Sequence, residues 1–135
     1  MNCRELLRAA SYDYAGGYLF EVRGLIRAEV SEDILEQATA LLQAGYKGPA
    51  CVAAGVVLEM TLKELCARKE ITPAKLETMN TNLCRAGVYN MGMQKQVTAW
   101  AERRNRGAHG EWDTFSEADV EDMIRGVTRL VTEYL

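Results

Sequence analysis

The chain has 135 residues, a length typical of one domain built around a single hydrophobic core. Hydrophobic residues make up 48% of it and charged residues 26%, which argues against a disordered or fibrous protein and is ordinary for a soluble globular one. The net charge is −3, so no overall positive field attracts nucleic acid, and such binding would need a local basic patch. We therefore expect a single domain over residues 1–135.

The cysteine and histidine content argues against a metal centre. No CxxC pair occurs, and the single histidine cannot complete a Cys/His zinc set. The N-terminus carries charged residues and no apolar signal core, and the longest apolar run, residues 49–58, is far too short to cross a bilayer. We expect a cytoplasmic location, no membrane contact, neither metal nor cofactor, and four reduced, mostly buried thiols: Cys3, Cys51, Cys66 and Cys84.

Apolar residues recur at helical spacing almost everywhere, which predicts an all-α bundle of about five to six helices. A short helix is expected at residues 2–14, after which Gly16 and Gly17 weaken or bend the chain. The amphipathic stretch that follows, to about residue 44, is one bent helix or two, because Ser31 and the acids after it could cap a new helix. The expected apolar side consists of Leu19, Phe20, Val22, Leu25, Ile26, Val30, Ile34, Leu35, Ala38, Leu41 and Leu42.

Residues 45–49 read as a turn, with Gly45 ending one helix and Pro49 in the first turn of the next. The next helix is apolar on all sides from residue 50 to 58, which predicts a central, buried position, and small residues at 53–55 would allow close helix approach. Thr72 with Pro73 predicts the start of another helix, which ends near Gly87.

Residues 90–92 read as a link into a helix that reaches Arg104, and residues 112–115 as a loop. Ser116 and Asp119 then resemble a capping box, with Phe115 and Val120 placed to staple it. The final helix is expected to bury Val120, Met123, Ile124, Val127, Leu130 and Val131.

The stretch 102–110 concentrates the chemistry of the chain. It holds the only histidine, His109, together with three arginines and Asn105. Histidine is the natural proton shuttle near neutral pH, and arginine offers a fixed fork of donors to phosphate oxygens. A base beside such a cation suits attack on a phosphodiester.

Two geometries are open for this stretch. On an intact helix Arg104 and His109 lie about 140° apart around the axis, while Glu102, Asn105 and His109 share one stripe. Either the helix continues and Glu102 with Asn105 orients the imidazole, or Gly107 lets it unwind and swings His109 toward Arg104. In a plainer interpretation the arginines form a solvated helix end, the imidazole is an ordinary surface or core residue, and the acids after it serve helix electrostatics.

The sequence 104–109, Arg-Asn-Arg-Gly-Ala-His, resembles the Arg-polar-x-x-x-His signature of the HEPN superfamily (higher eukaryotes and prokaryotes nucleotide-binding). Glu102 before it and Gly110 after it also fit. The helix at 54–65, with its small residues followed by Leu-Glu and Leu-Lys, is similar to a helix of defence-associated members. The likeness covers roughly residues 45–135, the motif-bearing part, while residues 1–44 match only as N-terminal amphipathic helices.

The resemblance implies an up-and-down helical bundle that forms a homodimer, in which the two motifs share one cleft. Active members cut RNA without a metal ion and leave a 2′,3′-cyclic phosphate. Carried over by position, His109 is the general acid/base, Arg104 stabilises the phosphate, and Asn105 holds the motif backbone or the phosphate. Residues expected to support them are Glu102, Arg106 and Glu59, the last of which either orients Arg104 or is a mere helix-surface charge.

The leading hypothesis is therefore a ribonuclease of toxin or defence type, with RNA as substrate and a cognate antitoxin or defence-system protein as partner. A non-catalytic HEPN module that binds a partner protein or a nucleotide is the alternative. A plain helical dimerisation domain, in which the arginines only cap a helix, is the third possibility.

Overall fold

A computed structural model describes residues 15–135, and the surroundings of side chains from residue 22 onward. Within this range every regular element is helical, which confirms the all-α class. The helix expected at 2–14, Cys3, and the side chains of Leu19 and Phe20 lie outside the described residues. The elements are α2 (Ala15–Gln43), α3 (Lys47–Arg68), α4 (Leu76–Arg85), α5 (Met91–Ala108), the 3₁₀-helix η1 (Trp112–Thr114) and α6 (Glu117–Tyr134).

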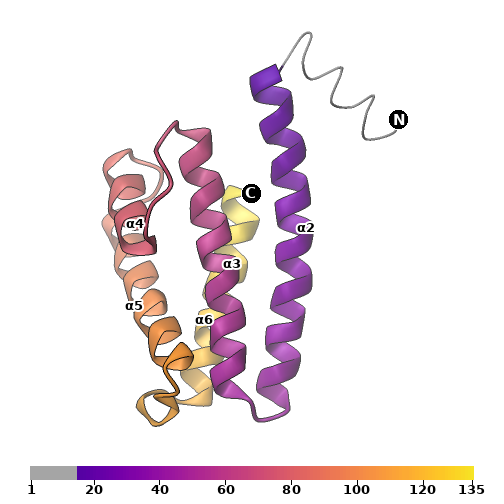
Figure 1. The fold of residues 1–135 in the computed structure, drawn as a ribbon, viewed down its shortest axis with the longest axis vertical. Coiled ribbons are helices and arrows are strands. Elements are labelled where there is room, and N and C mark those ends of the chain that lie inside the picture. The colour runs from indigo at the N-terminus through magenta and orange to yellow at the C-terminus, as the bar shows by residue number, and fades with distance from the viewer. Residues whose placement is uncertain (1–14) are drawn as a thin grey trace.

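The helices run up and down around α3, as predicted for the central helix (Figure 1). In this view α3 lies between α2 on one side and the α4–α5 pair on the other, with α6 behind it, and it contacts all four. The α2–α3 turn, the end of α5 and the start of α6 share the lower end of the bundle. None of the described helices is both long enough and apolar enough to cross a bilayer.

One unbroken helix, α2, spans residues 15–43, so of the two alternatives the single helix is confirmed and a second helix starting at Ser31 is wrong. Gly16 and Gly17 lie in its first turn, where a low helix propensity costs little. Ser31 is fully buried inside the helix instead of capping a second one. Packing of α2 against α3 and α6 supports the continuous helix and outweighs the local capping signal.

Only a narrow stripe of α2 is buried, which corrects the predicted apolar side. Leu25 and Ile26 are 67% and 56% exposed, and Val30 is 41% exposed. Leu25 lines the open pocket between α2 and α6 and stays accessible there, and Ile26 and Val30 lie outside the buried stripe. The buried stripe consists of Gly24, Ser31, Leu35 and Ala38.

The predicted burial of α3 is confirmed for most of its circumference, where residues such as Ala54 and Leu58 are fully buried. The exception is Val56, which is 43% exposed, with Val52 and Met60 half-buried one turn to either side. One apolar side of the central helix is therefore left uncovered in a single chain.

The predicted start of α4 is wrong. The helix begins at Leu76 with Lys75 as its N-cap, so Thr72 and Pro73 lie in the non-helical connection. Its end near Gly87 is confirmed, and this glycine has a φ of 77°. The expected link at 90–92 is also shorter than predicted, because the Asn90 side chain accepts the Met93 N–H at 2.9 Å and caps a helix that begins at Met91.

The capping box at the start of α6 is confirmed in both directions. Asp119 N–H donates to Ser116 Oγ at 3.1 Å, and Ser116 N–H donates to Asp119 Oδ2 at 2.9 Å. These bonds with Ser116 hold the pKa of the Asp119 carboxyl below its usual range. Phe115 and Val120 are buried in the same core, as are all six residues predicted for the final helix. Residues 112–114 of the expected loop form the short helix η1.

Candidate functional site

The motif stretch remains helical, so of the two geometries left open the helix continues and does not unwind at Gly107. Helix α5 continues to Ala108, and His109 is its C-cap. Gly107 is buried against α3, where an added Cβ would lie 3.4 Å from both Cys51 Cβ and the Gly48 carbonyl oxygen. Gly107 therefore lies in the contact between α5 and α3 and is not a hinge.

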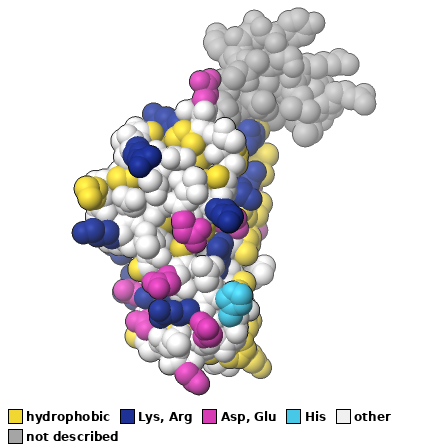
Figure 2. Space-filling model, turned by 60° about the vertical axis from the view of Figure 1, so that its left-hand side comes forward, with side chains coloured by type: hydrophobic (Ala, Val, Ile, Leu, Met, Phe, Trp, Pro, Cys, Tyr) yellow, Lys and Arg dark blue, Asp and Glu magenta, His cyan; other side chains and the backbone are white. Residues whose placement is uncertain are grey.

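The backbone at His109 is fixed by the way α5 ends. Gly110 adopts a φ of 73°, and its N–H donates to the Gly107 carbonyl at 3.3 Å. The Glu111 N–H donates to the Arg106 carbonyl at 2.9 Å, which completes a Schellman motif. The imidazole of His109 is exposed, and Figure 2 shows it in cyan on a face where acidic and basic side chains alternate.

Arg104 lies against the central helix. An added Cβ at Gly55 of α3 would overlap the aliphatic carbons of the arginine, so glycine is required for this packing. The Nη1 atom lies 3.5 Å from Glu59 Oε2, and Nη2 donates to Asn105 Oδ1 at 3.1 Å. The side chain keeps 22% of its surface exposed. The expected contact of Glu59 with Arg104 is therefore present, and the guanidinium is held in place while remaining accessible.

The other two arginines of the stretch point elsewhere. Arg103 Nη1 donates to the Asp119 carbonyl of α6 at 2.9 Å, and Arg106 Nη2 lies 3.4 Å from Glu102 Oε1 on α5. The three guanidinium groups thus reach three different partners and do not form one basic patch. Arg106 is paired with an acid, so the positive charge left over at the motif is small.

Within a single chain, Arg104 and His109 lie on different sides of α5, and the guanidinium contacts Glu59 and Asn105. With α5 intact, their Cα atoms are separated by about 7.5 Å along the axis and about 140° around it. Among the described residues, no hydrogen bond joins Glu102 or Asn105 to the imidazole, since Glu102 pairs with Arg106 and Asn105 with Arg104. The predicted orientation of the imidazole by these two residues is not seen.

Cys51 lies beside the motif but is not a nucleophile at neutral pH. Burial raises the pKa of its thiol to about 11, against a weaker lowering by the charges of Arg103 and Arg104. The Sγ atom is within 3.7 Å of Met123 Sδ in the core. The thiol therefore stays protonated, and the exposed imidazole is the better candidate base at this end of the bundle.

Sequence reasoning missed Trp112, which it placed in a loop without a role. Its indole N–H donates to the Gly107 carbonyl at 2.9 Å, and the ring covers Gly48 of α3 so closely that a Cβ there would overlap it. The residue is nevertheless 43% exposed. No sequence signal pairs Trp112 with Gly48, because the contact depends on how α5 crosses α3.

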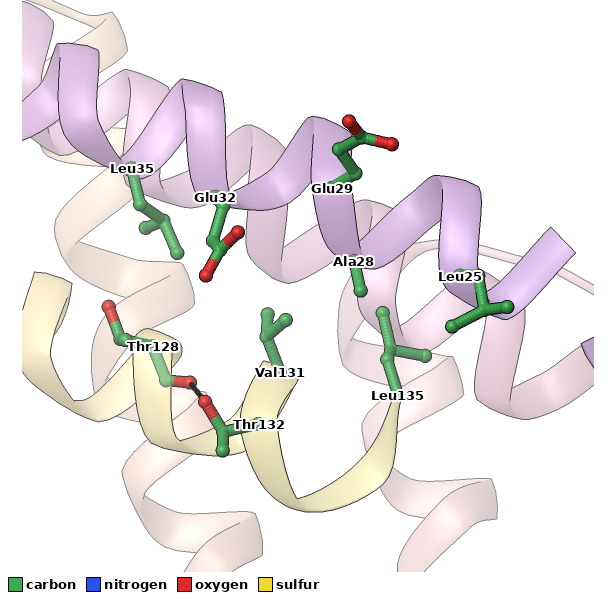
Figure 3. A pocket seen from close by; sticks show the side chains of 9 residues that line it. All are labelled: Leu25, Ala28, Glu29, Glu32, Leu35, Thr128, Val131, Thr132 and Leu135. Carbon is green, nitrogen blue, oxygen red and sulfur yellow. Dashed lines mark hydrogen bonds between the residues drawn. The ribbon is translucent and has the colours of Figure 1, made fainter. Parts of the chain in front are cut away.

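A pocket of about 380 Å³ lies away from the motif, between α2 and α6 (Figure 3). Glu32 points from α2 toward the threonines of α6, and Glu29 lies one turn away along α2. Two carboxylates disfavour a phosphate there, so this pocket is not the site for the predicted chemistry. Within residues 15–135, no three or more histidine, cysteine or acidic side chains come together as a metal site would require.

Comparisons of the chain with family models, curated proteins and solved structures found no match. The likeness to HEPN proteins therefore rests on residues 102–110 and on the helix at 54–65. Function has to be argued from what these residues do in the fold.

Proposed function

We propose that the protein is a HEPN-type, metal-independent endoribonuclease that acts as a homodimer. The observation that carries the proposal is the end of α5, which presents a guanidinium fixed against α3 and an exposed imidazole on a rigid helix terminus. Preorganised donors and a positioned base are what phosphodiester cleavage needs.

In the proposed reaction the 2′-oxygen of a ribose attacks the adjacent phosphorus and the 5′-oxygen of the next nucleotide leaves. An imidazole accepts the proton of the 2′-hydroxyl, and a second imidazole, protonated, gives a proton to the leaving oxygen. Arg104 donates to the non-bridging phosphoryl oxygens as charge develops on them. The products are a 2′,3′-cyclic phosphate and a 5′-hydroxyl, and no water or metal enters the balance.

Two features support a second copy of the chain as part of this site. One chain supplies a single imidazole, whereas the reaction uses a base and an acid. The uncovered apolar side of α3 centres on Val56, directly after Gly55 and three residues before Glu59, which hold Arg104. Two chains paired along this side by a two-fold axis would place their Arg104 side chains in one groove.

Cleavage of RNA in EDTA tests the proposal. The wild type is expected to cut tRNA or mRNA and to leave 2′,3′-cyclic ends, while His109→Ala is inactive. A single 2′-deoxy substitution at the cleaved position should protect the substrate, because the attacking hydroxyl is then missing. Arg125→Ala is the matched control, since Arg125 pairs with Glu121 on the exposed side of α6 and should cut normally. Equal cleavage by the wild type and His109→Ala would falsify the enzymatic proposal.

One observation favours a non-catalytic module instead. Arg104 is already engaged by Glu59 and Asn105, so its guanidinium is partly neutralised before any substrate arrives. On this alternative the wild type binds a nucleotide or a partner protein through Arg104 without cutting RNA.

A role in toxin or defence systems, with an antitoxin as partner, belongs to the enzymatic proposal. It predicts that expression of the wild type is toxic and that this toxicity is lost in Arg104→Ala.

A further inference from the structure

We propose that Trp112 is a stacking platform for an unpaired base of the RNA, next to the phosphate that is cut. The inference rests on the proposed function, because it names how that site selects its substrate. Stacking on Trp112 would make the protein prefer single-stranded RNA to duplex RNA, since only an unpaired base offers a free face to an aromatic ring.

The indole is held rigidly. Its N–H is bonded to the Gly107 carbonyl at 2.9 Å, and its ring covers the bare backbone of Gly48. Contacts on the edge and on one side fix the plane of the ring, yet 43% of the residue remains exposed. A large apolar ring that is both fixed and exposed is preorganised for a ligand, because little side-chain entropy is left to lose on binding.

The ring lies at the same helix end as the imidazole. The carbonyl that accepts the indole N–H belongs to Gly107, two residues before His109. The Schellman motif at Gly110 fixes the turn between the two side chains. Both side chains therefore belong to one helix end, and the proposal places the phosphate at His109 and the base on Trp112.

Base stacking would also supply affinity for RNA that the charge of the molecule does not. The net charge is −3, and of the motif arginines two are paired with acids and one with a carbonyl. Phosphate contacts alone therefore supply little affinity, whereas stacking does not depend on charge. Loss of one stacked base typically weakens binding about 5- to 150-fold.

Tryptophan fluorescence offers a direct test in the full chain carrying His109→Ala, which prevents cleavage. The chain has only two tryptophans, and Trp100 is 7% exposed, so quenching by added RNA reports on Trp112. We expect quenching by a single-stranded oligoribonucleotide. We expect none by an abasic strand with the same number of phosphates, and none by the duplex.

Substitutions of Trp112 in the His109→Ala protein show how much the indole contributes to RNA affinity, which is measured by the fluorescence anisotropy of a labelled strand. Trp112→Leu should weaken binding about 5- to 150-fold, while Trp112→Phe should retain part of it because a phenyl ring still stacks. Met91→Ala is the matched control, as it removes an exposed apolar side chain at the opposite end of α5 and should not change binding. If Trp112→Leu does not fold, the affinity of Trp112→Phe and the quenching measurement still test the inference.

The outcomes separate this inference from the proposed function. Binding of the intact strand without quenching, or equal affinity for the intact and abasic strands, would overturn the role of Trp112. The ribonuclease proposal would still be supported if the wild type cuts RNA. Failure of every strand to bind would also overturn it. Quenching that depends on bases, in a protein whose wild type does not cut RNA, would support the platform and end the ribonuclease proposal.

Discussion

At the scale of single residues, the motif depends on one glycine of the central helix. Gly55 leaves the space that the aliphatic part of Arg104 fills, and Glu59 one turn later holds the guanidinium. The atoms that an added Cβ would overlap are the Cβ, Cγ and Cδ of Arg104, close to the α5 backbone and not at the flexible end of the side chain. The arginine cannot simply rotate away, so the position of its guanidinium depends on residue 55.

Gly55→Ala is therefore expected to displace Arg104 and to lower RNA cleavage at least tenfold. It should also lower the free energy of unfolding by about 1–3 kcal/mol, the usual cost of overpacking. Chemical denaturation and the EDTA cleavage assay measure the two effects. Gly92→Ala is the control, because an added Cβ there meets only the Asn90 side chain at 3.3 Å. A Gly55→Ala protein that unfolds and cuts like the wild type would contradict the role given to this glycine.

Cys51 should be inert in the folded protein. With its pKa raised to about 11, about one thiol in 3,000 is ionised at pH 7.5, and burial blocks access as well. Iodoacetamide labelling followed by peptide mapping should leave Cys51 unmodified below pH 9 and modify it after unfolding. Because the pKa is raised, any labelling of the native thiol should increase as the pH approaches 11. Rapid labelling at pH 7.5, at the rate of the partly exposed Cys84, would refute the assignment.

At the scale of elements, the helix ends decide which boundaries the sequence predicts. Helices α2, α3, α4 and α5 all end in a Schellman motif, with its two backbone hydrogen bonds around a residue of positive φ. At Gly45 and Gly87 that residue is glycine, and the predicted ends were right. At the end of α3 it is Glu70, with a φ of 57°, which carries no such signal. Thr72 and Pro73 show the cap-and-proline pattern of a helix start but lie in the connection between α3 and α4.

Glu70→Gly is expected to stabilise the protein by up to about 1 kcal/mol, because a residue with a Cβ is strained in the left-handed region and glycine is not. In the described part of the chain, the Glu70 side chain makes no hydrogen bond or ion pair that the substitution would remove. Thermal unfolding of Glu70→Gly and of Glu70→Ala, which keeps a Cβ, separates this effect from loss of the carboxylate. Equal melting temperatures for the two variants would show that the backbone at residue 70 is not strained.

At the scale of the whole molecule, periodicity predicts that the chain is all-α and which residues fill its core. It cannot predict what covers each helix face. Val56, in the most apolar stretch of the chain, is exposed, and so is Leu25 on α2. The packing of Arg104 on Gly55 and of Trp112 on Gly48 depends likewise on how α5 crosses α3. The motif residues and the Glu59–Arg104 contact could be predicted from the sequence, whereas Trp112 and its contact with Gly48 come only from the fold.

The uncovered side of α3 leads to a prediction about assembly. The wild type is expected to be a dimer, and Val56→Glu a monomer, because two copies would bring the introduced charges into an apolar interface. The change should alter the stability of the single chain by only about 0.5 kcal/mol, as Val56 is exposed there. Light scattering after size exclusion measures the mass. Met91→Glu, at an exposed apolar position at the start of α5, should remain dimeric. A Val56→Glu dimer would exclude this face as the interface.

The central claim is that Arg104 and His109 cut RNA together, and the single-turnover rate of cleavage in EDTA tests it most directly. The account predicts a loss on the order of 100-fold or more for His109→Ala and for Arg104→Ala, each with an unchanged circular dichroism spectrum. Arg125→Ala should cut at the wild-type rate. Cleavage by His109→Ala at the wild-type rate, or a wild type that leaves RNA intact, would contradict the claim.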